Sequence, residues 1–501
     1  MKKLLIAIIT IIMATCVFTG CGDSVKPLDS STIVGNVLSG NGSFAVEKGD
    51  YVYFINGQEA VTVNNKFGEV EKASLVRIKT SDLAKHKFDI DNDDEFVPAT
   101  IETVIPKLFI SASYKTGVYM YGDYVYYATP STIKDKQSNV LNGQTQFFRF
   151  NLKTGKQDDC IAISEDNTVE YRFVQNNNTV YLVFTKSVTE DEVTTKSLCV
   201  YNADTRKEIE VDITYEELLI PEDNSSTIYF TKFGYNEENE ENEKYHKLYK
   251  YTIGATEADL VLSGSPEDLK VLQGATFTLI KNDGKYLFYK QTLLDTTNSS
   301  VKFYAKETAS ENAPILLGGS NAYISAAIVS NCYVKSLTEI YYMDSTTELS
   351  GFAKFNYTVT DMTNGRTPIN KDVAGYNFQF VENGFAYFSN SEGMYYRCDL
   401  EGNNFSQING VAMKTATDWY KPRVIGNYFI GSYSNELYDS YVYVIDMTNI
   451  GDKEVYDKYL EDVASEEEVN VKALLNTRIG IMTETDKEEL ETKLDEKFDE
   501  E

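Results

Sequence analysis

Short aromatic segments of one kind recur along the chain, each after a turn rich in Gly, Asn, Asp or Ser. Two of them are nearly identical, GDYVYF at 49–54 and GDYVYY at 122–127. As a β-strand, the second would place Tyr124, Tyr126 and Ala128 on one face and Val125 and Tyr127 on the other. Both faces of such a strand are apolar, so both must be covered by other parts of the protein.

Eight such runs predict the second strand of eight repeated units. They lie at 49–54, 122–127, 178–184, 226–233, 284–289, 338–345, 384–390 and 426–433. A further strand-like run follows each of them, and candidate inner strands precede five of them, at 42–49, 117–122, 170–177, 276–283 and 377–384. Four-stranded units that repeat every ~40–60 residues are typical of a β-propeller, in which each blade is covered by its neighbours.

We therefore predict an all-β fold, a β-propeller of eight blades with four antiparallel strands each, over residues 41–450. Seven blades are the alternative, because the fourth unit has no clear inner strand. Two separate sandwiches are a further alternative, which the spacing of equivalent strands disfavours. A composition of 42% apolar and 25% charged residues agrees with a globular protein.

The N-terminal segment has the pattern of a secretory signal. Lys2 and Lys3 precede an apolar run at 4–13, and small or weakly polar residues follow up to Cys21. We expect residues 1–20 to be a signal peptide and residues 21–40 a flexible tether. An uncleaved anchor is the alternative, but about fifteen apolar residues fall short of the roughly twenty that span a bilayer.

Residues 18–21, Phe-Thr-Gly-Cys, resemble a bacterial lipobox, although Phe18 stands where an aliphatic residue is usual. The resemblance implies that Cys21 is the lipid attachment site and becomes the N-terminus after cleavage. It also implies a lipid-anchored protein on the extracytoplasmic face of the cell membrane.

Three strands resemble the Tyr-Trp-Thr-Asp strand of the low-density lipoprotein receptor type of propeller, with Tyr or Phe where Trp would stand. They are IYYMDS at 340–345, IYFTKF at 228–233 and AYFSN at 386–390. Together with the lipobox, they resemble the cell-surface propeller lipoproteins of Gram-positive bacteria. This resemblance covers residues 42–450 and implies a fold and a location, but no catalytic residue.

The net charge of −29 limits the classes of partner. Nucleic acid and anionic lipid both require clustered Lys and Arg, so we expect no nucleic acid and membrane contact through the lipid anchor alone. We expect the partner to be a protein or a glycan at the cell envelope. We also expect the protein to be a monomer.

Catalytic and metal-binding groups are few. Four cysteines remain beyond the anchor, at 160, 199, 332 and 398, and form no CxxC pair. We expect free buried thiols, with a Cys160–Cys199 disulfide left open. The two histidines, His86 and His246, lie among lysines and are expected on the surface.

One acidic cluster resembles the start of a calcium loop. Asp89, Asp91 and Asp93 match its first three ligand positions, but Asp94 replaces the required Gly and Thr100 replaces the final Glu. We therefore expect a solvated acidic loop and no cofactor, with calcium as the alternative.

Two further segments stand outside the repeated strands. Trp419 and Tyr420 lie between two units and are the candidate ligand-binding residues. In the closing segment 451–501, a capping box at Thr485 and Glu488 and apolar residues at four-residue steps predict a short acidic helix. It would pack on the propeller, or bind a partner as the alternative.

These features favour a binding or scaffolding module over an enzyme. The ligand would be held by converging loops at one end of the central channel. A glycan-cleaving enzyme that uses loop carboxylates and an envelope assembly factor are the alternatives. The identity of the ligand stays open.

Overall fold

The protein was analysed as a computed structural model. The structure describes residues 25, 27–28, 37–57, 59, 65–85, 101–109, 117–131, 143–166, 169–221, 225–235, 244–294, 301–317, 331–336, 338–345, 350–356, 365–408, 422–434, 440–448, 450 and 478–479. Within these ranges, no helix has the length and apolar character needed to cross a membrane. Trp419, Tyr420 and the predicted C-terminal helix lie outside them.

The described strands form eight antiparallel sheets, and in seven of them the four strands are consecutive in the chain. The first four sheets contain β2–β5 (Ala45–Lys48, Tyr51–Ile55, Leu75–Lys79, Glu102–Ile105), β6–β10 (Val118–Tyr121, Tyr124–Pro130, Thr145–Asn151, Lys156–Gln157, Ala162–Ser164), β11–β14 (Tyr171–Asn176, Thr179–Glu190, Val193–Asn202, Lys207–Glu208) and β15–β18 (Leu218–Leu219, Thr227–Tyr235, Lys244–Thr252, Asp259–Ser263). The other four contain β19–β22 (Ala275–Asn282, Tyr286–Leu293, Val301–Glu307, Ile315–Leu317), β23–β26 (Cys332–Ser336, Glu339–Asp344, Gly351–Phe355, Arg366–Asn370), β27–β30 (Asn377–Glu382, Phe385–Ser389, Tyr395–Asp399, Ser406–Gln407) and β31–β34 (Arg423–Ile425, Tyr428–Ser434, Ser440–Asp446, Arg478–Ile479).

The predicted all-β fold and its repeat are confirmed. Each of the eight aromatic runs is the second strand of a sheet: β3, β7, β12, β16, β20, β24, β28 and β32. The inner strand that the sequence did not reveal in the fourth unit is β15, which is two residues long and pairs Leu218 with Phe230 and Leu219 with Tyr229. A strand this short leaves no periodic signal in the sequence.

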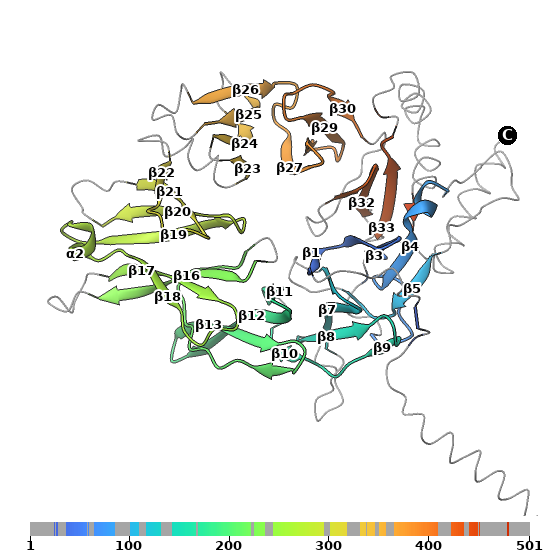
Figure 1. Cartoon of the computed structure of the whole chain (residues 1–501), viewed down its shortest axis with the longest axis horizontal. Helices are drawn as coiled ribbons and strands as arrows, with labels where there is room; N and C mark the ends of the chain where they lie inside the picture. Colours follow the sequence, from blue (N-terminus) through green and yellow to red (C-terminus); the bar gives the residue numbers. More distant parts are fainter. Residues whose placement is uncertain are drawn as a thin grey trace, which may run out of the picture.

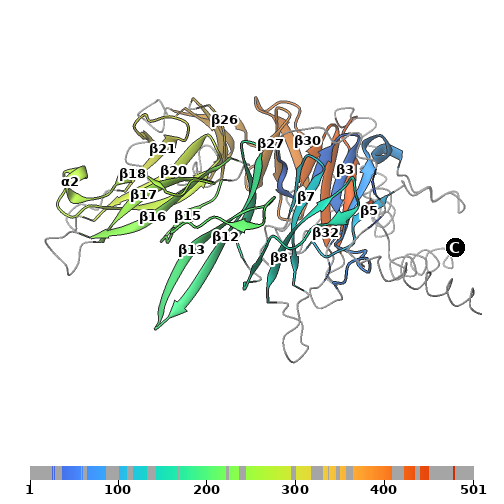
Figure 2. The same cartoon turned by 60° about the horizontal axis from the view of Figure 1, so that its bottom comes forward.

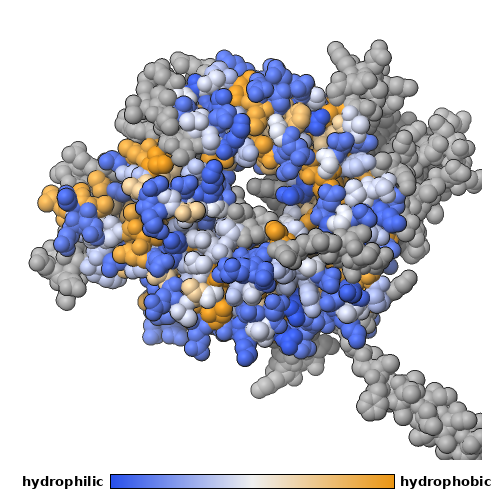
Figure 3. All heavy atoms as spheres, viewed as in Figure 1, coloured by the Kyte–Doolittle hydropathy of each residue, from blue (hydrophilic) through white to orange (hydrophobic). Residues whose placement is uncertain are grey.

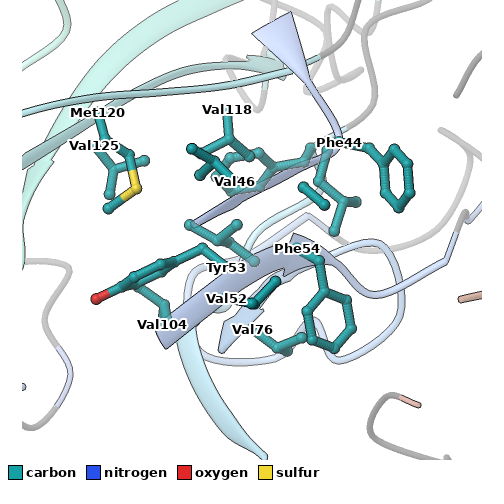
Figure 4. Close-up of a cluster of buried hydrophobic side chains, with 14 of the residues drawn as sticks. Phe44, Val46, Val52, Tyr53, Phe54, Val76, Val104, Val118, Met120 and Val125 are labelled. Atoms are coloured by element: carbon teal, nitrogen blue, oxygen red, sulfur yellow. The ribbon is translucent and has the colours of Figure 1, made fainter. Parts of the chain in front are cut away.

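The two faces of β7 are both buried, as the alternating pattern predicts. Tyr126 and Ala128 pack in one cluster with Phe173 and Leu182 of the β11–β14 sheet, and Tyr124 lies at its edge. Val125 and Tyr127 belong to the opposite cluster, which is shared with the β2–β5 sheet and drawn in part in Figure 4. The tyrosines of this strand are therefore core residues.

The same arrangement holds from sheet to sheet. Figure 1 shows the sheets following one another in chain order about a common centre, from the blue strands to the orange ones. Buried apolar clusters join neighbouring sheets, and Ile425 and Val442 of the last sheet lie in the same cluster as Phe44 and Val46, at the start of the first. Mutual burial of apolar faces thus holds these sheets together.

An additional strand, β1 (Ser39–Ser43), precedes the first sheet and pairs with β6 of the second. It approaches that sheet closely, because a Cβ atom on Gly117 would lie 1.9 Å from the carbonyl carbon of Gly42. Gly42 itself has a φ of +71°, a conformation that L side chains rarely adopt. These glycines let the N-terminal strand run along the inner edge of the β6–β10 sheet.

In each of three sheets, an arginine covers an aromatic ring of the second strand. The guanidinium carbon of Arg77 lies 4.0 Å from the centre of the Tyr51 ring, and the equivalent distances are 4.4 Å for Arg149 over Tyr124 and 4.5 Å for Arg397 over Phe385. Such cation–π contacts stabilise partly desolvated charges. Arg149 also forms an ion pair with Asp204, in the β13–β14 connection, and thereby links two sheets.

Replacing Tyr126 with Ala should lower the free energy of unfolding by about 3–5 kcal/mol, because a side chain that is 1% exposed leaves a cavity between two sheets. The matched control is Tyr235→Ala, where the ring is 59% exposed and the change should stay within about 0.5 kcal/mol. Chemical denaturation of both variants measures the difference. Equal losses in the two variants would contradict the burial of β7 on both faces.

Candidate interaction surface at the loop end

The two ends of the sheets differ in their connections. At one end, here called the turn end, first and second strands are joined by two or three residues in every sheet except β15–β18. The opposite end, here called the loop end, carries the second-to-third and the sheet-to-sheet connections. These include 56–74, 131–144, 264–274 and 408–422. The turn end has three long connections of its own, 80–101, 356–365 and 447–477, but all of them lead to outer strands.

Buried polar side chains hold the bases of the loops at the loop end. The side-chain Nδ2 of Asn65 donates to Thr129 Oγ1 and to the Pro130 carbonyl oxygen, both at 2.9 Å. The Oδ1 atom of Asn65 accepts the Leu108 N–H at 2.9 Å. Asn65 belongs to the first sheet's loop, Leu108 to the connection between β5 and β6, and Thr129 and Pro130 to the end of β7, so one buried amide joins two connections and a strand of the second sheet.

We call a polar side chain that joins two sheets in this way a bracket. A second bracket joins the β15–β18 and β19–β22 sheets. Glu217 Oε2 accepts the Leu279 N–H at 2.6 Å, while the backbone N–H of Glu217 donates to Thr231 Oγ1 at 3.2 Å. A carboxylate that satisfies a backbone donor of the next sheet is part of the framework of the loop end. This role cannot be predicted from the local sequence, because Glu217 stands in an acidic stretch like many others.

The expectation of an exposed histidine is wrong for His246. Its side chain is buried, its Nδ1 lies 3.1 Å from the Phe277 backbone nitrogen, and its ring packs 5.1 Å from that of Phe233. The lysines that suggested a surface position occupy other points of β17, whereas His246 faces β19 of the next sheet. His246 is therefore a third bracket at this end, and His86 lies outside the described residues.

Four of the exposed apolar side chains lie at the loop end. Val188 and Val193 lie on the β12–β13 hairpin, Tyr235 at the end of β16, and Leu272 in the connection to β19, with exposed fractions of 39, 66, 59 and 80%. We call these four residues the loop-end apolar set. They come from two neighbouring sheets and the connection that leaves the second. Figure 3 shows hydrophilic and hydrophobic residues interspersed over the face of the protein that it draws. A contiguous apolar patch formed by such residues would be a candidate interaction surface.

The site residues expected from the sequence lie outside the described ranges. This applies to the lipid attachment residue Cys21, to Trp419 and Tyr420, and to Asp89, Asp91 and Asp93. Trp419 and Tyr420 belong to the connection 408–422 between β30 and β31, which is one of the loop-end connections. Among the residues that the structure describes, no group of three or more His, Cys, Asp or Glu side chains could hold a metal ion.

Cys160, Cys199, Cys332 and Cys398 are free thiols, so the structure contains no Cys160–Cys199 disulfide. Cys332 and Cys398 are buried, whereas Cys160 and Cys199 are half-buried. Burial raises the pKa of the Cys398 thiol to about 12, with a further contribution from Asp399. That thiol therefore stays protonated and unreactive at neutral pH.

No protein-family model matches the chain, and no curated protein matches it either. Among solved structures, it is similar to an acylaminoacyl peptidase from Pyrococcus horikoshii, with 12% identity and a TM-score of 0.38 over 80% of this chain and 57% of that one. It is also similar to the β-propeller domain of the Trilobed protease from Pyrococcus furiosus, with 10% identity and a TM-score of 0.29 over 81% of this chain and 93% of that one. The chain spans little more than half the length of the peptidase. Its β-propeller architecture rests on its own repeated four-stranded sheets.

The Asn65 bracket gives a direct test of loop anchoring. Asn65→Ala leaves the buried Leu108 N–H without its acceptor, which should cost about 1–3 kcal/mol of stability and raise amide exchange at 107–109 and 129–131. Asn312→Ala, at an exposed site, is the matched control and should change neither quantity. Unchanged exchange in the Asn65 variant would show that this side chain does not hold the loops.

Proposed function

We propose that this protein is a lipid-anchored, extracytoplasmic propeller of eight blades that binds a protein partner at the cell envelope through its loop end. The observation that carries the proposal is the loop-end apolar set. Four exposed apolar side chains stand beside loops whose bases are fixed by buried polar brackets. A rigid frame that presents apolar groups binds with little loss of conformational entropy.

The count of eight blades is supported by the eight sheets and by the contacts between them. Each sheet would be one blade, with β1 as an additional inner strand of the second. The cluster shared by Ile425, Val442, Phe44 and Val46 supports a ring in which the last blade packs against the first. No strand of the N-terminal half enters the last sheet among the described residues, so side-chain burial would supply the closure.

Two carboxylates at the loop end favour binding over glycan cleavage. Glu217 accepts a backbone N–H of the next sheet. Asp344 is 4% exposed, accepts the Tyr342 hydroxyl at 2.8 Å and lies 3.3 Å from the Arg366 guanidinium. A glycosidase needs carboxyl groups that face the substrate as acid, base or nucleophile. The carboxylates of Glu217 and Asp344 instead bind other groups of the protein and stabilise the fold.

The segment after Cys21 supports an anchor that sits close to the propeller. The Val25 N–H donates to the Gly155 carbonyl oxygen at 2.8 Å, and the Leu28 N–H to that of Leu152 at 3.1 Å. Both side chains are partly buried against the first core cluster. Since Cys21 is four residues from Val25, an acylated Cys21 would lie within about 14 Å of this contact.

The partner proposal is tested by affinity capture from an envelope extract. A Tyr235→Asp/Leu272→Asp double variant should retain at most about one-tenth of the partner bound by the wild-type chain, because it places charges in the apolar surface. The matched control is Leu260→Asp/Leu316→Asp, on the outer strands β18 and β22, which should bind as the wild type does. Equal capture by both double variants, or release of sugars from a glycan panel without any retained protein, would overturn the proposal.

The anchor is tested separately by metabolic labelling with a fatty acid in cells of the protein's source. The wild-type chain should incorporate the label, and Cys21→Ala should not. Cys16→Ala is the control and should be labelled as the wild type is. Label in the Cys21 variant, or none in the wild type, would contradict lipid attachment at Cys21.

A further inference from the structure

The β12–β13 hairpin projects beyond the body of the protein. Figure 2 shows its end extending past the neighbouring strands. Residues 186–196 are all exposed, and none of the apolar clusters includes a residue between 185 and 197. We call residues 186–196 the arm. The Tyr215 N–H donates to the Lys196 carbonyl oxygen at the base of the arm, at 3.2 Å. Beyond that contact, an ordered β-ribbon that projects from the body of the protein presents backbone groups to a partner.

The outer edge of β12 has free hydrogen-bonding groups. The turn residues Asp191 and Glu192 both have positive φ, and Glu190 pairs with Val193 across this two-residue turn. In such a hairpin the flanking residues bond to each other, so the backbone groups of every second residue, Ser187 and Thr189 among them, point to the other edge. Thr185 shows this direction, because its N–H donates to the Glu170 carbonyl oxygen at 3.0 Å. Beyond Thr185, this edge of β12 has no partner strand within the described residues.

We propose that the arm pairs with the arm of a second copy of this chain. The two β12 edges would run antiparallel about a two-fold axis that passes between the two Val188 residues. Ser187 of one copy would then exchange both backbone hydrogen bonds with Thr189 of the second copy, and the same pair would form again on the other side of the axis. One four-stranded sheet would join the two molecules.

The side chains in this register are self-complementary. Lys186 stands opposite Glu190 of the second copy on both sides of the axis, and Val188 stands opposite Val188. These are non-hydrogen-bonded positions, where facing side chains are closest. A shift by two residues would place Lys186 or Glu190 opposite Val188, and a parallel alignment would place lysine against lysine. The charge order on the edge therefore selects one arrangement.

This dimer stands in place of the monomer expected from the sequence, and it uses Val188, one member of the loop-end apolar set. The two molecules would meet loop end to loop end. Five paired residues span roughly 17 Å, so the arms would act as spacers between the two loop ends. Tyr235 and Leu272 are not part of the pairing edge and stay available for a partner.

Disulfide cross-linking of the full-length chain in its own membrane tests the pairing. Val188→Cys places two thiols across the axis, at a separation that a disulfide can span, and should give a dimer band under mild oxidation. Val193→Cys is the matched control: it lies on the same face of the arm and is more exposed, 66% against 39%, but it is far from its counterpart. The wild-type chain reports any background from Cys160 and Cys199.

Charge reversal then separates pairing from random collision. In the Val188→Cys background, Lys186→Glu or Glu190→Lys should each lower the dimer yield about three- to tenfold, because like charges then face each other twice. The double reversal Lys186→Glu/Glu190→Lys should restore it. Equal cross-linking of Val188→Cys and Val193→Cys, or single reversals without effect, would overturn the proposal. Because no envelope partner takes part, this outcome is independent of the capture experiment.

Discussion

The architecture depends on one constraint: the second strand of each sheet carries apolar residues on both faces. A sheet of this kind is stable only when a second sheet covers each side, and that requirement passes to the next sheet in turn. In β7, the faces of Tyr126 and Val125 meet two different neighbours. A row of such sheets ends without exposed apolar faces only if its last member covers its first. Ile425 of the last sheet and Phe44 at the start of the first lie in one buried cluster, which supports the closed ring that we propose.

The sequence predicted what this constraint controls. The aromatic runs revealed the second strands and the repeat, since a short run of consecutive aromatic and β-branched residues after a turn is a local signal. The inner strand β15 was not predicted, because a strand of two residues is too short to show a periodic pattern in the sequence. His246 was misplaced for a related reason: flanking lysines suggested water, but burial in β17 is decided by the contact with β19, which local sequence does not contain. Asn65 and Glu217 were likewise invisible, because their partners lie in other sheets.

Function is expected away from the constrained core. The turn end joins its inner strands by minimal turns, whereas the loop end combines long connections, buried brackets and exposed apolar side chains. The arm extends from this end, and its residues are more polar and more exposed than those of the strands that continue into it. β12 is apolar on both faces up to Phe184 and polar or exposed from Lys186 onward. This change within one strand marks where packing in the fold ends and a surface for other molecules begins.

Closure between the first and last sheets is the central claim, and the distance between them tests it most directly. Glu47 of β2 and Asp446 of β33 are both exposed and can each carry a spin label. Pulsed electron–electron double resonance then measures the distance between the two labels in the folded chain. Because packed sheets lie about 10 Å apart, we predict one narrow distribution of distances below about 30 Å. A broad distribution centred beyond that range would mean that the two sheets do not meet, and would contradict the ring.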